Sequence, residues 1–148
     1  MAKAARRKAQ QKKNNYLLGG IIGLVVLGLG VVWLMSRNTP SAGSMPLEIS
    51  VQEAVAKQKA GAFILDVREP DEWNTVHIAG ATLIPLGELD SRLNELPKDK
   101  EIVVVCHSGN RSAKGRDILL NNGFTQVTSM AGGMNQWQAA GYPTVSGP

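Results

Sequence analysis

Residues 101–112 read EIVVVCHSGNRS, and this segment carries the clearest structural pattern of the chain. After Glu101 the apolar run IVVVC continues without a break to Cys106, a pattern typical of a parallel strand buried on both faces of a sheet. Residues 107–111 are small or polar and predict a tight loop, and a helical pattern follows over 112–121. Strand, loop and helix in this order predict a parallel α/β sheet, in which active sites lie beyond the carboxyl ends of the strands.

Cys106 ends this predicted strand and is the single cysteine of the chain, so it has no intramolecular disulfide partner. The loop N–H groups, the start of the next helix and the guanidinium of Arg111 all favour an anion beside the sulfur. We therefore expect a thiol with a lowered pKa that is nucleophilic near neutrality. Gly109 lets the loop turn, and Ser108 and Asn110 offer hydrogen-bonding side chains.

The rest of the segment 47–148 alternates apolar runs with helical patterns. Strands are predicted at 62–67, 81–85, 101–106 and 126–130, and helices at 50–59, 69–74, 86–96, 112–121 and 134–140. This rhythm predicts an α/β domain, with a parallel sheet flanked by helices on both faces.

Five segments agree in order and spacing with a known family. They are CHSGNR at 106–111 followed by Ser112, LDVRE at 65–69, HIAGA at 77–81, IPL at 84–86, and Gly132-Gly133 with Trp137 and Gly141-Tyr142-Pro143. Together they resemble the rhodanese family, over roughly residues 47–145. The resemblance implies a rhodanese-like α/β fold with a parallel sheet of about five strands.

The resemblance also implies a thiosulfate sulfurtransferase activity. The thiolate of Cys106 would take sulfane sulfur from thiosulfate or a persulfide, and would pass it from its own persulfide to cyanide or a thiol. Residues 107–110 would cradle the outer sulfur, and Arg111 would close the loop and help to bind an anionic donor. The implied site comprises Cys106 as nucleophile, the loop residues His107, Ser108, Gly109, Asn110, Arg111 and Ser112, and Asp66 and Arg68 in supporting positions.

The implied partners are a small anionic sulfur donor and a thiol or protein acceptor. His107 lies at the rim, where an imidazole would help to attract an anion, whereas His77 is expected to be a packed, hydrogen-bonded side chain. These histidines and Cys106 lack the ligand spacing of a metal site, so we expect neither metal nor cofactor.

Two alternatives stay open. One is a phosphatase or arsenate reductase, because related enzymes use a cysteine loop that is one residue longer than the four residues between Cys106 and Arg111. The shorter loop suits a single extra sulfur better than a tetrahedral oxyanion. The other is a membrane-tethered persulfide carrier or sensing module, which would keep the same cysteine and arginine but turn over slowly.

The first 40 residues carry seven basic and no acidic side chains, so nine basic and twelve acidic residues remain after them, a net charge of −3. The uncharged stretch Leu17–Met35 has 19 residues, which as a helix would extend about 28 Å, close to a bilayer core of roughly 30 Å. We therefore predict a basic arm at 1–15, a transmembrane helix at 16–35, a flexible linker at 36–46 and the rhodanese-like domain at 47–148.

Six basic residues precede the predicted span and one follows it, so the positive-inside rule places the N-terminus in the cytoplasm and the domain on the extracytoplasmic side. The sequon at Asn110-Arg111-Ser112 would put a glycan inside the loop, which favours a bacterial periplasm over an endoplasmic reticulum lumen. We expect the arm to meet anionic headgroups and not nucleic acid. A cleaved signal peptide is the remaining alternative for the apolar stretch.

Overall fold

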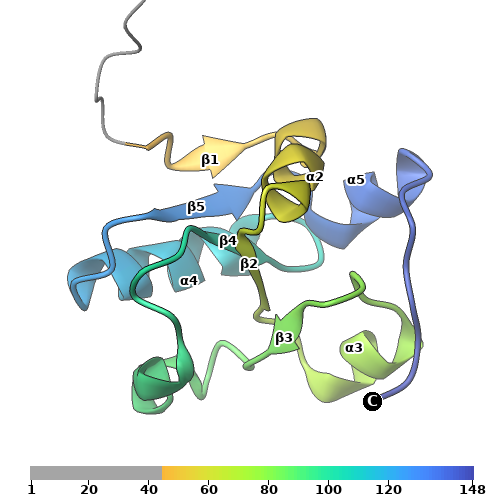
Figure 1. The fold of residues 1–148 in the computed structure, drawn as a ribbon. Helices are drawn as coiled ribbons and strands as arrows, with labels where there is room; N and C mark the ends of the chain where they lie inside the picture. Colours follow the sequence, from red (N-terminus) through yellow and green to blue (C-terminus); the bar gives the residue numbers. More distant parts are fainter. Residues whose placement is uncertain (1–44) are drawn as a thin grey trace, which may run out of the picture. The chain divides into compact units, whose positions relative to one another are not determined.

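Five parallel strands form one sheet in the order β1-β5-β4-β2-β3. The strands are β1 (Glu48–Ile49), β2 (Phe63–Asp66), β3 (Thr82–Leu83), β4 (Ile102–Val105) and β5 (Val127–Met130). The central strand β4 pairs with β2 on one side and with β5 on the other (Figure 1). The parallel α/β sheet of about five strands expected from the sequence is confirmed.

The computed structural model describes residues 45–148. The predicted arm at 1–15, the predicted span at 16–35 and nearly all of the predicted linker at 36–46 lie outside the described residues. No helix within the described part is long and apolar enough to cross a membrane. The transmembrane helix therefore stays a prediction.

Helices cover both faces of the sheet, as Figure 1 shows for α4 on one side and for α2 and α5 on the other. The helices are α2 (Val51–Lys59), α3 (Pro70–Thr75), α4 (Asn110–Asn121) and α5 (Gly133–Ala139), with the short 3-10 turns η1 (Leu89–Ser91) and η2 (Leu93–Glu95). Successive residues of β4 alternate between two apolar clusters: Ile102 and Val104 belong to one, Val103 and Val105 to the other. The apolar run therefore forms a strand that is buried on both faces, as predicted.

One predicted element takes another form in the structure, and one strand was not predicted. The segment 86–96, predicted as a helix, forms the two 3-10 turns η1 and η2 instead. Its Ser91 hydroxyl donates to the carbonyl of Glu88, a local bond of the kind that competes with α-helical pairing. Its apolar residues still pack on the core, so the burial pattern was right although the helix type was wrong. The short strand β1 had no apolar run long enough to predict it.

A buried ion pair joins the end of β2 to α3. The Arg68 and Asp66 side chains are 2% and 1% exposed, and Arg68 donates through Nε and Nη2 to the carboxylate at 2.7–3.0 Å. The same guanidinium also donates to the carbonyls of Glu72 at 3.3 Å and Val76 at 2.7 Å. Because both carbonyls belong to α3 and its C-terminal cap, this arginine fixes the position of that helix.

Arg68→Ala should lower the free energy of unfolding by about 3–5 kcal/mol, because it leaves the buried Asp66 carboxylate without its cation and with only the backbone N–H of residue 68 as a donor. Urea denaturation of wild type and variant measures the difference. Arg92→Ala is the matched control, since Arg92 pairs with Glu88 and Glu95 at the surface and its loss should have little effect. Similar midpoints for both variants would show that the buried pair does not hold α3 in place.

Candidate active site

Cys106 follows β4 directly, and α4 begins at Asn110, two residues earlier than the sequence predicted. The loop is therefore only 106–109. Gly109 closes it with a φ of 107°, which favours glycine, and a Cβ there would lie 3.3 Å from the backbone nitrogen of Gly132. The carboxyl end of the central strand, the loop and the N-terminus of α4 thus meet at the sulfur.

The N-terminus of α5 packs against the same loop. Met134 N–H donates to the Cys106 carbonyl at 2.8 Å, and Asn135 N–H donates to the His107 carbonyl at 3.1 Å. A Cβ on Gly133 would lie 2.3 Å from the Cys106 carbonyl oxygen, so only glycine permits this approach. The close backbone approach at 132–133 holds the loop from the side opposite α4.

The thiol lies at the bottom of the loop, and Cys106 is only 1% exposed. Its sulfur accepts a hydrogen bond from the Gly109 N–H at 3.1 Å and lies 3.6 Å from the Ser112 hydroxyl. The Ser112 hydroxyl in turn donates to the Gly109 carbonyl at 2.8 Å. Ser112 is fully buried. The hydrogen-bond neighbours of its hydroxyl are the Cys106 sulfur and the Gly109 carbonyl.

Burial raises the pKa of Cys106, but the hydrogen bonds around the sulfur outweigh it and the net effect lowers the pKa. Those bonds come from the Ser112 hydroxyl and from the N–H groups of Ser112, Gly109 and Ser108. The lowered pKa agrees with the sequence-based expectation. The groups that mainly lower the pKa of Cys106 are neutral dipoles. The sequence had predicted that the guanidinium of Arg111 also lowers it.

Arg111 pairs with a residue that the sequence analysis did not single out. Its two terminal nitrogens donate to the two carboxylate oxygens of Glu72, each at 2.7 Å. The hydrogen bonds from Arg111 hold the pKa of Glu72 below its usual value, against the opposing effect of partial burial. Arg111 therefore closes the site by joining α4 to α3, and its charge is largely matched by that of Glu72.

The sequence held one signal for Glu72. A cation fixed beside the loop needs a counter-charge, and the segment that follows β2 contains three acids, Glu69, Asp71 and Glu72. Nothing in the pattern says which of them faces the loop. The choice is made by the Arg68 contacts that set the orientation of α3.

The remaining predicted residues lie at the rim or behind it. His107 is half-exposed and its Nδ1 lies 3.8 Å from a Glu72 oxygen, while Ser108 and Asn110 are exposed. Asp66 pairs with Arg68 instead of reaching the sulfur. His77 is packed, as expected. Its ring stacks on the Trp73 ring with 3.6 Å between the ring centroids, and its Nδ1 is hydrogen-bonded to the Trp73 carbonyl.

A cavity of about 340 Å³ adjoins the loop. Its lining combines one loop residue, His107, with residues of α3 and α5 and the buried arginine: Arg68, Glu72, Thr75, Val76, Met134 and Gln138. Between 45 and 148, no three histidine, cysteine or acidic side chains cluster as metal ligands would. The cavity reaches the loop at His107, and its volume is large enough for a small organic molecule.

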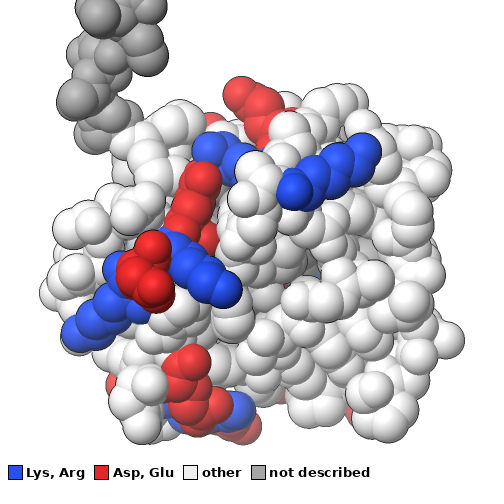
Figure 2. Space-filling model, viewed as in Figure 1, with Lys and Arg blue, Asp and Glu red and all other residues white. Residues whose placement is uncertain are grey.

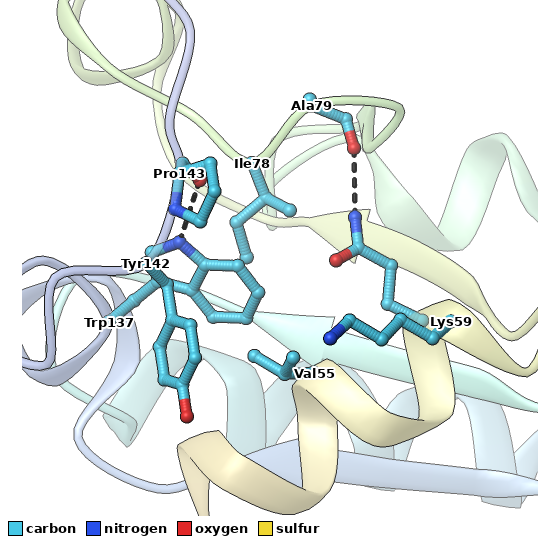
Figure 3. Close-up of a pocket in the computed structure, with 8 residues that line it drawn as sticks. Val55, Lys59, Ile78, Ala79, Trp137, Tyr142 and Pro143 are labelled. Carbon is cyan, nitrogen blue, oxygen red and sulfur yellow. Dashed lines mark hydrogen bonds between the residues drawn. The ribbon is translucent and has the colours of Figure 1, made fainter.

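A second, more enclosed cavity of about 190 Å³ lies away from the thiol (Figure 3). It is formed by α2, α5 and two loops, and Val55, Ile78 and Trp137 line it with apolar surface. Trp137 donates from Nε1 to the Pro143 carbonyl across its edge. No residue of the loop 106–109 lines it, so it is separate from the sulfur chemistry.

The family model of the rhodanese-like domain matches residues 50–140, which include every strand but β1 and the whole of the loop around Cys106. The chain belongs to the rhodanese-like domain family.

Several named proteins are similar to this rhodanese-like chain. The thiosulfate sulfurtransferase GlpE of Pseudomonas syringae pv. syringae is 34% identical over 101 residues, covering 67% of this chain and 94% of GlpE. YrkF of Bacillus subtilis, whose name describes a candidate sulfur carrier, is 38% identical, but the match spans only 54% of its length. A crystal structure of a rhodanese-related protein from Thermoplasma volcanium superimposes with a TM-score of 0.64 at 35% identity, covering 68% of this chain and 98% of that one.

Ser112→Ala should raise the pKa of Cys106, because it removes a hydroxyl that opposes the effect of burial. The midpoint of iodoacetamide alkylation against pH should move to higher pH, with a several-fold slower rate at neutrality. Ser108→Ala is the matched control, since Ser108 acts on the sulfur through its backbone N–H. Equal midpoints for both variants would show that the Ser112 hydroxyl does not stabilise the Cys106 thiolate.

Proposed function

We propose that the chain is a rhodanese-type sulfurtransferase that carries sulfane sulfur as a persulfide on Cys106. The observation that carries this proposal is the buried sulfur with a lowered pKa, held by the Gly109 N–H where β4 meets α4. A thiolate in this position attacks the sulfane sulfur of a donor. The donor's S–S bond breaks, the leaving group departs with the electron pair, and Cys106 keeps the outer sulfur.

The second half of the cycle transfers that sulfur onward. A nucleophilic acceptor, cyanide or a thiolate, attacks the outer sulfur of the persulfide, the Sγ–S bond breaks and the Cys106 thiolate is released. In both halves negative charge lies at the sulfur atoms, where the N–H groups of the loop stabilise it without rearranging. The name of GlpE supports a thiosulfate sulfurtransferase activity for the related chain.

A persulfide carrier is the second candidate, and two observations favour it. Cys106 is 1% exposed, which limits access by bulky acceptors, and YrkF is named for sulfur carriage. A carrier would be loaded like the enzyme but would release its sulfur only to a partner protein. Loading without multiple turnovers on cyanide or small thiols would distinguish the carrier from the enzyme.

The phosphatase alternative has less support from the geometry. A tetrahedral oxyanion bound over the sulfur would need the guanidinium of Arg111 as a counter-charge. Arg111 instead uses both terminal nitrogens on Glu72. The loop also begins its helix one residue before Arg111, which leaves a small ring suited to one added sulfur atom.

Cys106→Ser should lower thiocyanate release by on the order of a thousandfold, because the sulfur acceptor atom is lost. The assay incubates the purified chain with thiosulfate or a small persulfide and then with cyanide. Mass spectrometry of the wild type should show the gain of one sulfur atom on Cys106 and its removal by cyanide. Undiminished turnover in the variant would contradict the proposal.

We propose further that residues 16–35 anchor the chain in a membrane, with the arm 1–15 in the cytoplasm and the rhodanese-like domain on the periplasmic side. The uncharged stretch between a basic arm and a polar linker supports this.

The full chain should then stay with the membrane fraction after extraction with alkaline carbonate, whereas a variant without residues 1–44 should be released into the supernatant. Deletion of 1–15 alone is the control, because it keeps the apolar stretch. Release of the full chain, or shortening of its mass by signal cleavage, would contradict an uncleaved anchor.

A further inference from the structure

The two guanidinium groups near the thiol are both neutralised. Arg111 is held by Glu72 through two bonds of 2.7 Å, and Arg68, which lines the cavity, is held by Asp66. In both cases the positive charge is already matched by a carboxylate of the protein, although Arg111 keeps N–H groups that it does not use on Glu72. The resemblance implied that Arg111 helps to bind an anionic donor, and such a donor would meet an arginine whose charge is shared with Glu72.

The carboxylates near Arg111 leave it no unmatched positive charge. Glu72 pairs with it directly, and Glu69 lies on the same segment that follows β2. Glu69 and Asp71 are exposed, and Glu69 also acts on Arg111 through space. On the face drawn in Figure 2, acidic and basic side chains lie intermixed and form no concentrated basic patch among residues 45–148.

The cavity beside the loop has more room than a sulfur oxyanion needs. It measures about 340 Å³, and the side chains of Thr75, Val76, Met134 and Gln138 give it an uncharged wall. These side chains suit the carbon skeleton of an organic thiol, and the one arginine that lines the cavity, Arg68, is already paired with Asp66. The volume and the charge therefore point to the same kind of donor.

We propose that Glu72 sets the donor specificity of this site, so that its preferred donor is an organic persulfide with at most one negative charge near the sulfur, and not the thiosulfate dianion. The inference rests on the proposed sulfurtransferase function and narrows its substrate class. Glu72 is a specificity-determining residue: it cancels the attraction that Arg111 would otherwise exert on a second anion approaching the thiolate.

The transfer step is balanced with either donor. With a persulfide, the Cys106 thiolate attacks the outer sulfur of RS–S⁻: the Sγ–S bond forms, the donor's S–S bond breaks, RS⁻ leaves with the electron pair, and Cys106 carries the negative outer sulfur. With thiosulfate the leaving group is sulfite, which carries two negative charges past Glu72. Neither step needs an added oxidant or reductant.

The test measures the second-order rate constant for persulfide formation on Cys106 of the full chain, by quenched mass spectrometry, with thiosulfate and with the persulfide of 2-mercaptoethanol. Glu72→Gln keeps the shape and a hydrogen-bond acceptor for Arg111 but removes the charge. It should raise the thiosulfate rate constant roughly fivefold and the 2-mercaptoethanol persulfide rate constant less than about twofold. Asp71→Asn is the matched control on the same helix and should leave both rate constants within about twofold.

The wild type should react at least about tenfold faster with the 2-mercaptoethanol persulfide than with thiosulfate. Higher ionic strength should accelerate its reaction with thiosulfate, because screening weakens the repulsion between like charges. This salt dependence tests the inference even if Glu72→Gln folds poorly. A wild type that prefers thiosulfate, or that slows with salt, would overturn the donor assignment while leaving sulfur transfer intact. Failure of Cys106 to gain sulfur from either donor would overturn the proposed function itself.

Discussion

The hydrogen bonds that hold Cys106 at both its ends are the constraint on which the rest of the site depends. Its carbonyl accepts the N–H of Met134, and its sulfur accepts the N–H of Gly109. Cys106 is therefore hydrogen-bonded at the N-termini of both α4 and α5. The sulfur cannot move without disturbing these two helices, which pack on opposite faces of the sheet. Both hydrogen bonds require glycine at 109 and 133. The reactivity of the thiol therefore depends on the backbone conformation at these two positions.

The sequence was sufficient for most of the architecture because the decisive signal is local. An apolar run followed by a glycine-containing loop and a helix predicted β4, the loop and α4, and only the start of the helix shifted, to Asn110. What the sequence could not supply was the partner of Arg111, because Glu72 reaches it across 39 positions of chain. The 3-10 turns of 86–96 were missed for a different reason, since apolar spacing reports which side chains are buried and not how the backbone bonds.

Thiolate stability and donor attraction are separate properties in this molecule. The groups that lower the pKa of Cys106 are a hydroxyl and backbone N–H dipoles, whose influence falls off within a few ångströms. A free guanidinium would have acted on both the thiolate and an approaching donor, since the field of a full charge extends to about a Debye length of roughly 8–10 Å. Through its ion pair with Glu72, Arg111 still connects α4 to α3. The carboxylate cancels most of the electrostatic field that the guanidinium would exert on more distant groups.

The isolation of Cys106 has a consequence for the fate of its persulfide. The chain has no second cysteine, so no internal thiol can displace the outer sulfur and form a disulfide. The acceptor must come from outside and must reach a residue that is 1% exposed. An outer sulfur bonded to the buried Sγ would be the more accessible of the two atoms, so attack there is sterically favoured over attack at Sγ, which would produce a mixed disulfide and lose the sulfur as sulfide. Burial of the thiol thereby directs the reaction toward transfer of the sulfur atom.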